Sequence, residues 1–91
     1  MREMISGAEV RAARALLDWT VRDLARLAIV SVAAVNTIEE TRELPFEMIA
    51  RLESIRETLE TAGIEFLDGD APGVNLIFDD PRRAWSHRIG K

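Results

Sequence analysis

Two hydroxyl side chains, Thr20 and Ser31, stand eleven residues apart in the segment that most constrains how this chain folds. Each precedes a run of apolar residues at helical spacing, and a hydroxyl in that place accepts a hydrogen bond from the first free N–H groups of a helix. Asp23, three residues after Thr20, favours a capping box. We therefore expect two short helices, over 21–28 and 32–40, that cross at a steep angle with the second one presented outward.

Two longer helices are predicted on either side of this pair. Ser6 is placed to cap a helix over 7–17, and a second helix is expected to start at Pro45 and to end near Ala62. Proline fits a first helical turn because its missing N–H has no partner there. Gly63 suits the left-handed position that follows a helix. The side chains expected to face inward are Val10, Ala13, Leu16 and Leu17 in the first helix and Ile49, Leu52, Ile55 and Leu59 in the second.

The segments 64–67 and 74–78 alternate apolar and polar residues around a loop rich in Gly, Asp and Pro, which predicts a β-hairpin. An isolated hairpin is marginal in water, so it must pack on its own helices, pair with a second chain, or both. We expect a homodimer that forms through the hairpins, with or without the helix that ends near Ala62; the alternative is a hairpin that covers the core of its own monomer. The expected organisation is a helical domain over 1–62, a hairpin extension over 63–80 and a flexible tail over 81–91.

Composition excludes several classes of protein. The 91 residues suffice for a single core and include no cysteine and one histidine, so neither a disulfide framework nor a Cys/His metal site is expected. No apolar run approaches the ~20 residues of a membrane span, and the N-terminus does not resemble a signal peptide, so we expect a cytoplasmic protein. No glycine-rich phosphate loop or nucleophile–base arrangement is evident. We therefore expect neither an enzyme nor a bound cofactor or metal, and no small-molecule pocket is evident.

An ordered set of short motifs across residues 5–62 resembles the XRE family of phage-repressor-like DNA-binding domains. These motifs are RAARALLDWT at 11–20, DLA at 23–25, VSVA at 30–33 and IEE at 38–40. The resemblance implies a bundle of four or five helices that contains a helix-turn-helix, here followed by the C-terminal β-hairpin. It also implies a transcriptional regulator that binds double-stranded DNA as a dimer and reads the major groove with the third helix.

The resemblance implies roles for particular side chains. The residues expected to face bases are Val32, Ala33, Asn36 and Thr37. The residues expected near phosphates are Thr20, Arg22, Ser31 and Arg42, with Arg11 and Arg26 as further candidates. Finally, the resemblance implies a partly buried salt bridge between Arg14 and Glu39 that ties the first helix to the third; the alternative is that both are ordinary surface charges.

Charge and two departures from the family pattern favour a second interpretation. The chain has a formal net charge of −4, and its segment 32–40 contains no Lys or Arg. Ile29 stands where the family usually has glycine, so a left-handed backbone there would be strained. Val21 stands where a polar residue is common. With Val32 and Ala33, these two side chains would form an apolar patch on a protein-binding module derived from a helix-turn-helix, of the antitoxin or anti-activator type.

Overall fold

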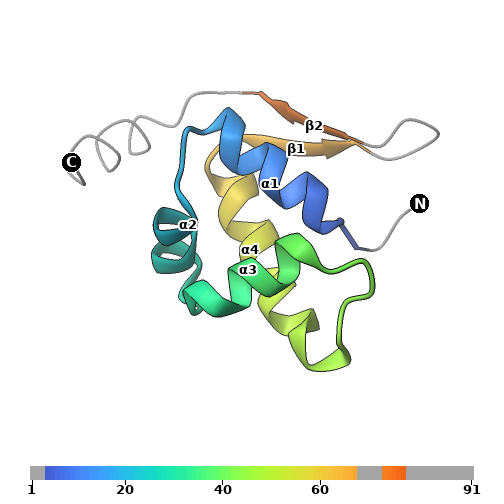
Figure 1. The fold of residues 1–91 in the computed structure, drawn as a ribbon. Helices are drawn as coiled ribbons and strands as arrows, with labels where there is room; N and C mark the ends of the chain where they lie inside the picture. Colours follow the sequence, from blue (N-terminus) through green and yellow to red (C-terminus); the bar gives the residue numbers. More distant parts are fainter. Residues whose placement is uncertain (1–3, 68–72, 78–91) are drawn as a thin grey trace.

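The computed structural model describes residues 4–67 and 73–77, and within them the chain is mainly helical with a small antiparallel hairpin (Figure 1). This confirms the expected class. The elements are α1 (Gly7–Leu16), α2 (Val21–Ala28), α3 (Val32–Glu40), the 3-10 turn η1 (Phe46–Met48), α4 (Ile49–Thr61), β1 (Ile64–Leu67) and β2 (Gly73–Leu76). The predicted hairpin loop, the end of the second predicted strand at Phe78 and the predicted tail over 81–91 lie outside the described residues.

Local hydrogen bonds set the first three helix starts as the sequence predicts. The Ser6 and Thr20 hydroxyls accept from the backbone N–H groups of Glu9 and Asp23, at 3.2 and 3.0 Å. Both carboxylates accept in return from the N–H of the capping residue, which completes two capping boxes. At the start of α3 the Ser31 hydroxyl accepts from the N–H of Ala34 at 3.0 Å. The first turn of α3 is therefore fixed by its own sequence.

One hydrophobic core joins the four helices and the hairpin. Leu17, Leu24 and Ile38 are among its fully buried side chains, from the end of α1, from α2 and from α3. The prediction for Leu16 is wrong, because 44% of this residue is exposed while Leu17 is fully buried. Leu17 lies four residues after buried Ala13, on the same side of the chain, whereas Leu16 lies to the side of that face.

The helix predicted from Pro45 begins later than expected. Pro45 precedes a single 3-10 turn, which is closed by a hydrogen bond from the Met48 N–H to the Pro45 carbonyl at 2.9 Å. Helix α4 itself starts at Ile49. Ile49 is only partly buried, so the expected inward stripe of α4 consists of Leu52, Ile55 and Leu59. The end of the helix follows the prediction, with Gly63 at a φ of +112°.

The hairpin covers the core of its own chain. Its register pairs Ile64 with Leu76 and Phe66 with Val74, and these four side chains lie on the face that packs against the helices. Strand β2 packs on α1 and β1 packs on α4, so α1 lies between the hairpin and α3 (Figure 1). Pairing with a second chain stays a prediction. None of the helices in the described part of the chain has the length and apolar character that a membrane span needs.

Candidate nucleic-acid interface

Helix α3 packs on α1 and α2 with one face and leaves the other open. The residues buried on its inner face are Ala34, Val35, Ile38 and Glu39. The exposed residues are Val32, Ala33, Asn36, Thr37 and Glu40. The structure thus brings the four predicted base-contacting residues together on one outward face, in two adjacent pairs that are one helical turn apart. The side chains of Asn36 and Thr37 form no hydrogen bond to any other described residue, so their polar groups are free to bind a ligand.

The predicted phosphate-contacting residues come from three places around α3. Thr20 and Ser31 are exposed at the starts of α2 and α3, where their hydroxyl oxygens already accept capping bonds. Arg22 is exposed on α2, and Arg42 is exposed in the segment after α3. Neither guanidinium forms a hydrogen bond or ion pair with another described residue. Among the four residues predicted to contact phosphates, Arg22 and Arg42 therefore supply cations without a partner in the described part of the chain.

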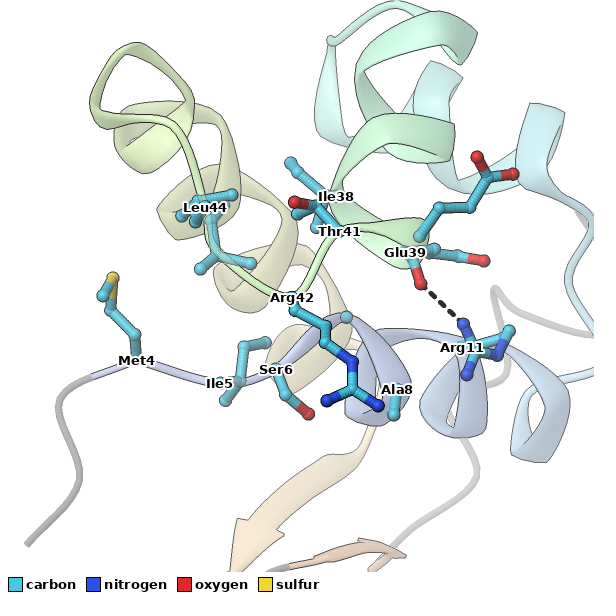
Figure 2. A pocket seen from close by; sticks show the side chains of 13 residues that line it. Met4, Ile5, Ser6, Ala8, Arg11, Ile38, Glu39, Thr41, Arg42 and Leu44 are labelled. Atoms are coloured by element: carbon cyan, nitrogen blue, oxygen red, sulfur yellow. Dashed lines mark hydrogen bonds between the residues drawn. The ribbon is translucent and has the colours of Figure 1, made fainter.

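The two further arginine candidates have partners inside the chain. Arg26 lies 3.7 Å from the Asp23 carboxylate and stays largely exposed, so this contact holds it weakly. Arg11 instead donates through Nη1 to the backbone carbonyl of Glu39 at 2.6 Å (Figure 2). That carbonyl lies in the last turn of α3, where helix carbonyls lack intrahelical partners. Arg11 therefore satisfies the end of α3, a role that the sequence analysis did not identify.

Arg14 and Glu39 form the expected ion pair. Arg14 Nε donates to Oε2 at 2.9 Å and Nη2 to Oε1 at 3.0 Å, so the contact is bidentate. Only 6% of the Glu39 side chain and 20% of the Arg14 side chain are exposed. Arg14 Nη1 also donates to the carbonyl of Trp19 at 3.0 Å. The hydrogen bond to Glu39 and the charge of its carboxylate raise the pKa of Arg14 above its ordinary value, against the opposing effect of burial, so this arginine stays charged.

A cleft that the sequence did not reveal lies between the start of α1 and the end of α3 (Figure 2). It has a volume of about 830 Å³, and Met4, Ile5 and Leu44 contribute apolar side chains to its lining. Arg11 and Arg42 both line it (Figure 2), and of these two arginines Arg42 is the one without a partner among the described residues. The four arginines considered for phosphate contacts therefore divide into two groups, one on α2 and one beside this cleft.

The turn between α2 and α3 is strained at Ile29. This residue has φ 58° and ψ 50°, the left-handed conformation that a β-branched side chain rarely adopts. Two bonds close the turn, from the Ile29 N–H to the Arg26 carbonyl and from the Val30 N–H to the Ala25 carbonyl, which is the pattern that usually has glycine at this position. The Ile29 side chain is 89% exposed and so gains little from packing.

The apolar patch predicted around this turn needs one correction. Val21 is only partly exposed and packs against the core, so it contributes less to an open surface than the sequence predicts. Leu27, near the end of α2, is 40% exposed and is a further exposed apolar side chain close in sequence to Ile29 and Val32. Its exposure could not be read from the helical period alone, because it depends on which side of α2 the other helices cover.

Comparison with known proteins assigns no family: no family model matches the sequence, and no curated protein is significantly similar to it. The described residues contain no group of three or more His, Cys, Asp or Glu side chains that could hold a metal ion.

Proposed function

We propose that this protein is a sequence-specific DNA-binding transcriptional regulator of the XRE type that reads the major groove with α3. The observation that carries the proposal is the division of α3 into two faces. Its inner face is fixed to α1 and α2, and its outer face presents Val32, Ala33, Asn36 and Thr37 without internal partners. Amide and hydroxyl groups hydrogen-bond to base edges, and small apolar groups contact the thymine methyl.

The dimensions of α3 support this role. Nine residues give a helix of roughly 14 Å, which spans about four base pairs, and a helix fits the width of the major groove. Ala33 and Asn36 are small, so the helix axis can come close to the base edges. The hairpin packs on the far side of α1 and leaves the exposed face of α3 open (Figure 1).

Phosphate contacts supply much of the affinity of proteins for DNA, and here they would come from few cations. Arg22 and Arg42 are free, and the N–H groups at the capped starts of α2 and α3 add partial positive charge. The net charge of −4 opposes binding at long range. We therefore expect a modest affinity that falls steeply as salt is added.

The homodimer belongs to the same proposal, because two-fold symmetric sites are read by two copies of a helix-turn-helix. Sedimentation or light scattering at micromolar concentration measures the mass. Two chains per particle support the dimer, and a single chain removes it.

The test of DNA binding is a salt series with promoter fragments from upstream of the coding sequence and a random duplex of equal length. We expect the promoter to bind more tightly, and Thr37→Ala or Asn36→Ala to reduce this preference while binding to the random duplex is unaffected. Arg22→Ala is the matched control. It should weaken binding to both duplexes alike and reduce the slope of log affinity against log salt concentration by about one. A folded protein that binds neither duplex at low salt would contradict the proposal.

The apolar turn favours a second candidate function, a protein-binding module that docks a partner on Leu27, Ile29 and Val32. The observation behind it is Ile29, whose backbone is strained and which is 89% exposed. Neither core packing nor hydrogen bonding of its side chain explains an isoleucine at this position. Ile29→Gly separates the two candidates. If the patch binds a protein, this variant loses the partner; if α3 reads DNA, it retains the promoter preference.

A further inference from the structure

The first turn of α3 is the apolar part of its outward face. Val32 is 41% exposed and Ala33 is exposed beside it, while the polar pair Asn36 and Thr37 follows one turn later. The bond from the Ala34 N–H to the Ser31 hydroxyl fixes this turn. Valine also has a single strongly preferred side-chain rotamer in a helix. The structure therefore holds a rigid methyl-bearing surface in the position that meets the base edges if α3 enters the groove.

Helix α3 lacks the basic side chains that most often read guanine. The commonest specific contact in the major groove is an Arg or Lys that donates to guanine O6 and N7, and no residue from Val32 to Glu40 is basic. The free arginines lie outside the helix, on α2 and after the end of α3. What the first turn offers instead is apolar contact. In the major groove the apolar group that distinguishes one base pair from another is the 5-methyl group of thymine.

We infer that the first turn of α3 recognises thymine by its methyl group, so that the bound half-site contains thymines where Val32 and Ala33 lie. This inference rests on the DNA-binding function proposed above and adds the chemical feature that is read. A buried methyl group is worth about a fourfold change in affinity. Two adjacent thymines would then give roughly a fifteenfold preference over the same site without methyl groups.

Replacing thymine by deoxyuridine tests this directly, because it removes the methyl group and keeps every hydrogen-bonding atom of the base pair. The probe is the duplex that the protein enriches most strongly from a random library, resynthesised with deoxyuridine at one thymine at a time. We expect about a fourfold loss at one or two clustered positions in each half-site, and no change at the others.

Variants of the protein assign the effect to the first turn. Val32→Ala should reduce the difference between thymine and deoxyuridine toward equality at the position that Val32 contacts. Leu27→Ala is the matched control, since Leu27 is apolar and 40% exposed but lies on α2; it should leave the difference intact. Thr37→Ala should weaken binding to both duplexes alike. Because all three side chains are exposed, melting temperatures should confirm that the variants fold.

The outcomes separate the inference from the function on which it rests. Equal binding of thymine and deoxyuridine duplexes at every position overturns the methyl reading and leaves DNA binding standing. A methyl effect that survives Val32→Ala and disappears in Leu27→Ala also overturns it, because another helix would then read the base. Failure to enrich or bind any duplex at low salt overturns both proposals.

Discussion

Variants of the ion pair between Arg14 and Glu39 distinguish charge compensation from simple packing. If the charges compensate each other, the double variant loses less stability than Arg14→Met alone. Arg14→Met removes two hydrogen bonds from a carboxylate that is only 6% exposed, and one from the Trp19 carbonyl. An unpaired buried charge is strongly destabilising, so we expect a loss of about 3 kcal/mol. Glu39→Met leaves a guanidinium that is 20% exposed and still bonded to Trp19, and should cost about 2 kcal/mol.

The double variant is the decisive measurement. With Met at both positions no charge is left buried, and we expect a loss of about 1 to 2 kcal/mol, less than for Arg14→Met alone. The loss in the double variant is then about 3–4 kcal/mol smaller than the sum of the two single losses. Urea unfolding at neutral pH, with matched m-values, gives all four stabilities, and Arg14→Lys supplies an intermediate case if Arg14→Met does not fold. Strictly additive losses would refute the reasoning.

Two further substitutions test the backbone. Ile29→Gly should raise the free energy of unfolding by roughly 0.5–1 kcal/mol, because relief of the left-handed strain exceeds the added chain entropy; Ile29→Ala keeps the strain and should give no such gain in the same urea titration. Gly7→Ala should lower the free energy of unfolding by about 1–3 kcal/mol, although alanine is the better helix former. The reason is that the Cβ of the alanine would overlap the Ile38 carbonyl oxygen. A more stable Gly7→Ala protein in thermal unfolding would show that α1 and α3 are not in close contact there.

The features that the sequence predicted well are those decided within a few residues. The starts of α1, α2 and α3 follow from Ser6, Thr20 and Ser31, whose hydroxyls bond to N–H groups three residues ahead. The outward face of α3 follows from the period of the helix. By contrast, Pro45 is equally suited to start a 3-10 or an α-helical turn, so the sequence did not distinguish between η1 and an earlier start of α4.

The features that it missed depend on approaches between distant segments. Arg11 has the character of a free surface cation, and only the fold brings the Glu39 carbonyl to it from 28 residues away. The cleft beside Arg42 likewise exists because the start of α1 and the end of α3 meet there. The sequence predicts strain at Ile29 only if the backbone there is left-handed, and the structure shows that φ is positive.

The two faces of α3 allow function and stability to be tested separately. Its inner side is held by Arg14 on the Glu39 carboxylate, by Arg11 on the Glu39 carbonyl and by the close approach of Gly7. Its outer side contributes no such contacts, and substitutions of exposed residues of this kind usually change stability by less than about 0.5 kcal/mol. Altered binding in Asn36→Ala or Val32→Ala, without a change in melting temperature, can therefore be attributed to the interface itself.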